Sequence, residues 1–167
     1  LSFGWPYNYV TSFFISFYKI FGLWAEPYFV SGILTYFLAS LEIYFFIKTL
    51  TKDKLIAVLS SFIFATGYIG LDQFTMMSVS SINNLNIINV CITLILFILW
   101  IDTRKWRFYF ATIFTFWISV TAFPFRAFPL LLFLPTIELI LSFKPEKPTA
   151  IFKKLIFIGI SFLPFLF

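Results

Sequence analysis

Arg126 lies in the turn Pro124-Phe125-Arg126, between two apolar runs. From the distribution of charge along the chain, we expect it to be the lone cation in the loops that face outward. A guanidinium recessed in such a turn can bind a lipid phosphate through two parallel hydrogen bonds. Alternatively, the side chain extends to the headgroups of bulk lipid, as long cationic side chains do. The sequence leaves both interpretations open.

Other polar side chains cluster on the same expected side. Asp72 and Gln73 open a second outward segment, where they either bind a sugar or polarise an acceptor, or form a solvated loop. Asn83, Asn86 and Asn89 recur at intervals of three residues near the start of an apolar run. Amides on one helix face either bond to other helices or line a wet cavity.

Two carboxylates, Glu42 and Glu138, fall inside apolar runs, where ionisable groups often mark function. Each is also close enough to a basic segment to reach the inner interface. The single cysteine, Cys91, is expected to be a small core residue. Because the chain has no histidine, imidazole metal sites and histidine-based triads are excluded within it. We predict no metal site and identify no cofactor.

The elements that carry these residues are expected to be membrane helices. The chain is 61% hydrophobic and 11% charged, with a mean hydropathy of +0.99, whereas soluble proteins carry roughly 25% charged residues. We therefore predict an all-α polytopic transmembrane helix bundle of about six spans, in the cell membrane. The expected spans are Pro27–Lys48, Leu55–Leu71, Ile82–Ile101, Phe108–Phe123, Ala127–Phe143 and one that begins at Leu155.

Residues 1–26 are expected to form a helix from about Tyr7 to Phe21 that stops near Gly22. This segment is either a marginal span or an interfacial helix. We treat residues 1–167 as one transmembrane domain. Because the chain starts without Met and ends within an apolar run, we also expect it to be truncated at both ends.

The basic residues predict the orientation. Ten of the twelve Lys and Arg residues fall in three segments, Lys48–Lys54, Arg104–Arg107 and Lys144–Lys154. Successive spans put all three on one side, and cationic loops are retained in the cytoplasm. The net charge of +5 therefore indicates membrane lipids as partners and no nucleic acid.

Small residues recur along the first clear span. Ser31, Thr35 and Ala39 are spaced four residues apart, so they form one stripe on the helix. Such stripes allow close approach between helices in lipid. We predict that this stripe faces another helix.

Four stretches follow one another in a characteristic order along the chain. They are GWPYNY, KIFGLWAEPYF, IKTLTKDKLIAVLSSFIFA and VTAFPFRAFPLLLFLP. This order resembles the membrane core of type-C-fold glycosyltransferases, the group of protein O-mannosyltransferases and aminoarabinose transferases. The resemblance implies transfer of a sugar from a polyprenyl-phosphate donor to an extracytoplasmic acceptor. It further implies direct displacement at the anomeric carbon, with an acidic base and cations that hold the phosphate.

The resemblance places Trp5, Pro6, Tyr7 and Arg126 at positions similar to those of the family. The family's acidic motif would lie before Leu1, so the catalytic residues are not assigned. Gly4 precedes Trp5 where the family usually has a basic residue, so that phosphate contact cannot be carried over. The candidate substrate-binding residues are Arg126, Asp72, Gln73, Trp5 and Tyr7.

Two other functions remain open. A multi-pass transporter or flippase is favoured by Glu42, Glu138 and a helix expected to be broken around Pro129 and Pro135. A non-catalytic assembly or sensor subunit is the other alternative.

Overall fold

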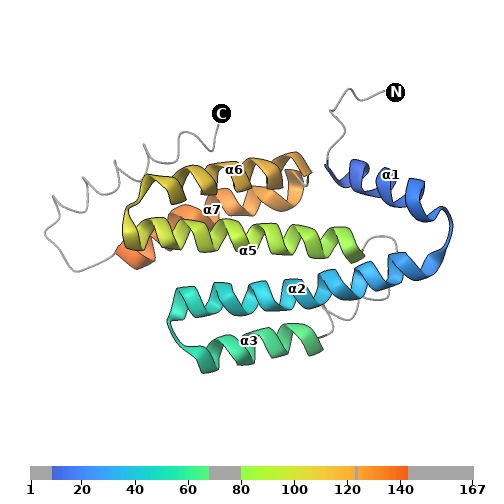
Figure 1. Cartoon of the computed structure of the whole chain (residues 1–167). Helices are drawn as coiled ribbons and strands as arrows, with labels where there is room; N and C mark the ends of the chain where they lie inside the picture. The colour runs from blue at the N-terminus through green and yellow to red at the C-terminus, as the bar shows by residue number, and fades with distance from the viewer. Residues whose placement is uncertain (1–8, 68–79, 123, 143–167) are drawn as a thin grey trace, which may run out of the picture. The chain divides into compact units, whose positions relative to one another are not determined.

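The computed structural model describes residues 9–67, 80–122 and 124–142 (Figure 1). All regular elements within these ranges are α-helices, which confirms the all-α class for that part of the chain. The chain divides into two compact units, Leu1–Cys91 and Ile92–Phe167. Helix α5 (Ser80–Thr103) contributes its first half to the first unit and its second half to the other.

In the first unit, helix α1 covers Tyr9–Phe21. It ends where predicted, at Gly22, whose positive φ of 59° suits a residue without Cβ. The Gly22 amide donates to the carbonyl oxygen of Tyr18 across 2.8 Å. Its thirteen described residues give a length of about 20 Å, which is shorter than the roughly 30 Å of a bilayer core.

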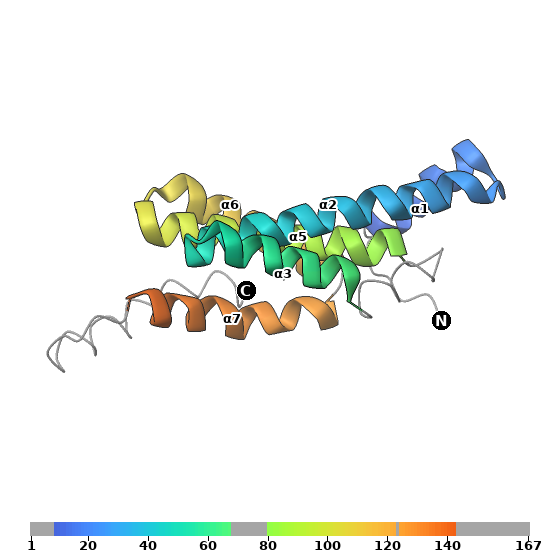
Figure 2. The same ribbon diagram turned by 90° about the horizontal axis from the view of Figure 1, so that it is seen from below.

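Helix α2 (Ala25–Thr51) and helix α3 (Lys54–Thr66) form a hairpin, side by side in both views (Figures 1 and 2). The turn is only two residues long. Lys52 adopts the left-handed conformation with φ of 59°, and Asp53 caps α3 by accepting from the amides of Leu55 and Ile56. Helix α2 thus continues past Lys48, where its span was predicted to end.

Helix α3 is shorter than predicted. It ends at Thr66, not at Leu71, and residues 68–71 lie outside the described residues. Gly67 follows in an extended conformation and donates its amide to the carbonyl oxygen of Ile63. A Cβ at Gly67 would lie 2.6 Å from that same oxygen, so glycine suits this close approach.

In the second unit, the second half of α5 is followed by α6 (Trp106–Ala122) and α7 (Pro124–Ser142). Arg104 ends α5 with φ of 53°, and its amide donates to the carbonyl oxygen of Trp100. The turn between α2 and α3 and the turn between α5 and α6 thus each contain a basic residue in the left-handed conformation. Phe116, Leu130 and Leu134 are among the buried core side chains of α6 and α7.

Two predictions about α7 were wrong. The expected turn Pro124–Arg126 forms the first turn of the helix, where proline is favoured because its missing N–H needs no partner. The helix also continues through Pro129 and Pro135 without a break. Membrane helices tolerate prolines where other groups satisfy the freed carbonyls.

Among the described residues, two helices are long and apolar enough to cross a membrane, α2 and the Asn83–Thr103 part of α5. Lys54–Thr66 and Pro129–Glu138 are apolar but shorter. Both α2 and α3 leave large apolar side chains exposed, including Phe37, Leu38, Phe62 and Ile63. Such surfaces are unusual in contact with water and ordinary in contact with lipid.

Candidate functional site

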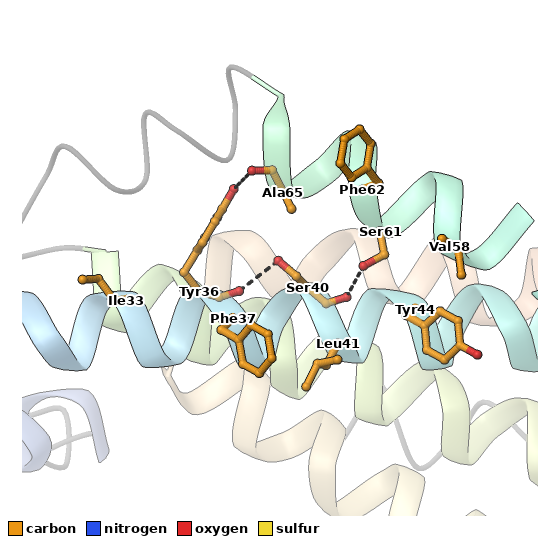
Figure 3. A pocket seen from close by; sticks show the side chains of 10 residues that line it. All are labelled: Ile33, Tyr36, Phe37, Ser40, Leu41, Tyr44, Val58, Ser61, Phe62 and Ala65. Carbon is orange, nitrogen blue, oxygen red and sulfur yellow. Dashed lines mark hydrogen bonds between the residues drawn. The ribbon is translucent and has the colours of Figure 1, made fainter. Parts of the chain in front are cut away.

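Helices α2 and α3 form an open apolar groove of about 610 Å³ between them (Figure 3). Both helices supply its walls. The lining residues are Ile33, Tyr36, Phe37, Ser40, Leu41 and Tyr44 from α2, with Val58, Ser61, Phe62 and Ala65 from α3.

Three of the four hydroxyl groups that line the groove are bonded to main-chain carbonyl oxygens. The Tyr36 hydroxyl donates to Ala65 across 2.8 Å, and Ser61 Oγ donates to Ser40 across 2.7 Å (Figure 3). Ser40 Oγ in turn donates to the carbonyl oxygen of Tyr36 across 3.0 Å. Because these hydroxyl hydrogens are committed, the groove offers mainly hydrocarbon and ring carbon to an occupant.

This geometry suits an extended apolar chain. Ile33 and Tyr44 are eleven residues apart on α2, so the groove follows the helix for about 16 Å. Its described lining residues include no acidic or basic side chain, so the groove offers an apolar binding surface without charge.

A second feature, which we call the α2–α5 seam, comprises Ser31, Gly32, Thr35, Ser81 and Asn84. The Oγ atoms of Ser31 and Ser81 are 2.9 Å apart, and Asn84 Nδ2 donates to Gly32 O and Thr35 Oγ1, each at 3.4 Å. All five residues belong to the first unit.

The seam confirms the prediction for the small-residue stripe. Ser31 and Thr35 contact α5, and Ala39 is fully buried. Asn84, however, was missed, because the sequence pattern drew attention to Asn83, Asn86 and Asn89. The sequence did contain a pattern that indicates Asn84. Its spacing of three residues from Ser81 and seven from Cys91 puts these side chains on one face of α5. Cys91 is buried and free, as expected for a small core residue.

The second unit holds an ion pair. Arg104 Nη1 donates to Glu138 Oε1 across 3.4 Å, and the guanidinium carbon lies 4.8 Å from the centre of the Trp100 ring. The sequence left open that Glu138 reaches the inner interface, but its side chain is buried, with 1% of it exposed. Its other oxygen, Oε2, has no hydrogen-bond partner.

The predicted site residues are not brought together in the part of the chain that the structure describes. Trp5, Tyr7, Asp72 and Gln73 lie outside it. Arg126 is placed by its backbone in the first turn of α7, and its side chain also lies outside. Within the described ranges, no group of three or more acidic, cysteine or histidine residues is arranged to hold a metal ion.

A smaller hollow of about 350 Å³ lies beside the first turn of α2, where Ala25, Phe29 and Val30 provide apolar walls and Glu26 a carboxylate. The carboxylate of Glu26 is exposed and is the single charged group among the described lining residues of this hollow. We assign it no chemistry.

Comparison with known proteins gives no relative. No protein-family model, no curated protein and no solved structure matches the chain.

Proposed function

We propose that the protein is a multi-pass membrane glycosyltransferase that uses a polyprenyl-phosphate sugar donor, and that the α2–α3 groove holds the prenyl chain of that donor. One observation carries the proposal: an apolar groove in a helical hairpin, in which three of the four lining hydroxyl groups donate to main-chain carbonyl oxygens. The resemblance of the sequence to type-C-fold glycosyltransferases supplies the reaction.

The chemistry of the groove matches this ligand. A prenyl chain is a hydrocarbon, so it gains from burial against Phe37, Leu41 and Val58 without any hydrogen bond. The hairpin exposes apolar side chains, and an occupant can therefore enter sideways from lipid. In the predicted topology, the Ala25 end of α2 is external, which would place the donor phosphate on the outer side.

The six-span arrangement belongs to this proposal. The predicted topology puts Lys52, Lys105 and Lys147 in the cytoplasm and Asp72 and Arg126 outside. Helix α1 then lies in the outer interface, which suits its short length. Transfer would follow direct displacement: the acceptor oxygen bonds to the anomeric carbon, the bond from that carbon to the donor phosphate oxygen breaks, and a base takes the acceptor proton.

A flippase would also bind a prenyl chain, so the two functions must be separated by their products. The transporter alternative drew on Glu42, Glu138 and a broken helix. Helix α7 is continuous, and Glu138 is paired with Arg104, so two of its three supports are weaker than the sequence suggested. A transferase releases polyprenyl phosphate, whereas a flippase moves the intact donor.

The test is sugar transfer in liposomes that contain the protein and a radiolabelled hexosyl polyprenyl phosphate, with a membrane extract as the source of acceptors. We expect label to leave the lipid and polyprenyl phosphate to form. Val58→Trp should lower this rate several-fold, because the indole fills the groove. Leu59→Trp is the matched control, since Leu59 is 51% exposed, against 55% for Val58, and does not line the groove. Intact donor that merely changes leaflet, or equal effects of the two variants, would contradict the proposal.

A further inference from the structure

The α2–α5 seam contains a buried acceptor without a donor. Asn84 is 0% exposed, and its Nδ2 donates to Gly32 O and Thr35 Oγ1. Its Oδ1 atom has no hydrogen-bond partner. An unpaired carbonyl oxygen is unfavourable in a buried site, and such groups in native proteins call for an explanation.

The orientation of the amide is fixed by its neighbours. The hydroxyl of Thr35 donates to the carbonyl oxygens of Ser31 and Gly32, at 2.8 and 3.1 Å, so its oxygen can only accept from Asn84. The carbonyl oxygen of Gly32 also only accepts. Exchanging the nitrogen and oxygen of the Asn84 amide would set an acceptor against two acceptors. Oδ1 is therefore the atom that lacks a partner.

The hydroxyl hydrogens beside Asn84 are also committed. Ser31 Oγ donates to the carbonyl oxygen of Tyr28 across 2.8 Å, which makes Ser81 the donor in the 2.9 Å contact between the two serines. The polar atoms of the seam that can still form a hydrogen bond are therefore acceptors, namely Asn84 Oδ1 and Ser81 Oγ. Such a site rejects phosphate and carboxylate, which only accept, and favours groups that donate, such as hydroxyls.

We propose that this seam binds the sugar of the lipid-linked donor, with a sugar hydroxyl donating to Asn84 Oδ1 and another to Ser81. This inference rests on the proposed function and adds the place of the glycosyl group. Ser31 lies six residues after Ala25, and Ser81 is the second residue of α5, so both are near the helix ends expected outside. The groove begins at Ile33 and runs along the opposite side of α2, so a donor that occupies both sites must pass around this helix.

The seam must part slightly to admit a hydroxyl group, because Asn84 Oδ1 is inaccessible in the closed form. The two hydrogen bonds of Asn84 oppose this movement only weakly. Both Asn84 bonds are 3.4 Å long, beyond the usual 2.7–3.2 Å for N–H···O bonds, and are therefore weak. A sugar hydroxyl that reaches Oδ1 would supply the missing donor.

The experiment compares two probes in liposomes that contain the protein: a mannosyl polyprenyl phosphate and the bare polyprenyl phosphate of equal chain length. We expect the mannosyl lipid to bind about three- to tenfold tighter, as one or two neutral hydrogen bonds allow. Asn84→Leu should bring the ratio of the two affinities close to one while the affinity for bare lipid is kept. Asn89→Leu, an asparagine of the same helix outside the seam, should keep the ratio.

Ser81→Ala is the second variant, because it removes an acceptor with little change of shape. It should lower the ratio of the two affinities in part. If Asn84→Leu also weakens binding of the bare lipid, the result for Ser81→Ala decides whether the seam binds the sugar. An unchanged ratio in Ser81→Ala, or no preference for the mannosyl lipid in the unaltered protein, would overturn the seam as a sugar site and leave the groove standing. If the unaltered protein binds neither lipid, the proposed function fails, and this inference fails with it.

Discussion

Ser61 of α3 donates its hydroxyl hydrogen to the main-chain carbonyl oxygen of Ser40 in α2 across 2.7 Å. Tyr36 makes the opposite link, from α2 to the carbonyl oxygen of Ala65 in α3. The two bonds join the helices in both directions and take hydroxyl groups out of the groove (Figure 3). The apolar character of the groove and the cohesion of the hairpin thus have a common cause.

Replacing Ser61 by Ala should destabilise the hairpin. The variant loses one interhelical hydrogen bond, which in membrane helices contributes about 0.6 kcal/mol on average and about 1.7 kcal/mol at most. The free energy of unfolding in mixed micelles measures the effect. Ser60→Ala is the matched control, because Ser60 is the adjacent serine and does not line the groove. Equal losses in the two variants would show that the Ser61–Ser40 bond contributes nothing specific.

The Arg104–Glu138 pair predicts a non-additive result. Arg104→Leu leaves a buried carboxylate without its cation and should lower the free energy of unfolding by about 1–3 kcal/mol. Adding Glu138→Leu should recover most of that loss, because the buried charge is then gone. A double-mutant cycle measures the coupling. If the double variant is no more stable than Arg104→Leu alone, Arg104 does not stabilise the fold through its ion pair with Glu138.

The turn at Lys52 predicts a stabilising change. Lys52 has φ of 59°, a conformation that costs a residue with a Cβ about 1 kcal/mol and glycine almost nothing. Lys52→Gly should therefore raise the midpoint of thermal unfolding in detergent. Lys54→Gly is the control, because it removes the same charge from the first turn of α3 and should lower the midpoint. A fall in both variants would mean that the charge outweighs the backbone conformation.

The role of Arg126 as a phosphate ligand stays a prediction, because its side chain lies outside the described residues. Arg126→Ala should lower affinity for a polyprenyl-phosphate donor about ten- to a hundredfold, which corresponds to a charge-assisted contact of about 1.5–3 kcal/mol. Arg126→Lys should have a partial effect, since it keeps the charge and loses the planar fork. Donor binding in liposomes, with the amount of folded protein measured separately, provides the check. Unchanged affinity in the Ala variant would make Arg126 an ordinary headgroup anchor.

The sequence was most informative where local patterns decide the structure. Long apolar runs located α2 and α5 to within a few residues, because hydrophobicity and helix length determine such elements together. Gly22 marked the end of α1 through its conformational freedom. The stripe that begins at Ser31 predicted a helix contact, because its spacing matches one helix face.

Other features depend on contacts distant in the chain. Arg104 and Glu138 are 34 residues apart, and their pairing depends on how separate helices pack, which periodicity does not contain. The α2–α3 groove likewise depends on which faces of the two helices pack together, which the sequence does not reveal. Gly67 ended α3 through a close approach to Ile63, which no apolar pattern indicates. The candidate site residues Asp72 and Gln73 lie outside the described residues, so they stay predictions.

Photo-crosslinking tests most directly whether the groove binds the prenyl chain. The protein is irradiated in liposomes with a polyprenyl phosphate that carries a photoreactive group in mid-chain, and the labelled residues are identified by mass spectrometry. We expect the label on groove residues such as Tyr36, Tyr44 and Val58, with several-fold less in Val58→Trp and no loss in Leu59→Trp. Label spread over exposed residues outside the groove, such as Leu38, and unaffected by Val58→Trp would contradict the assignment.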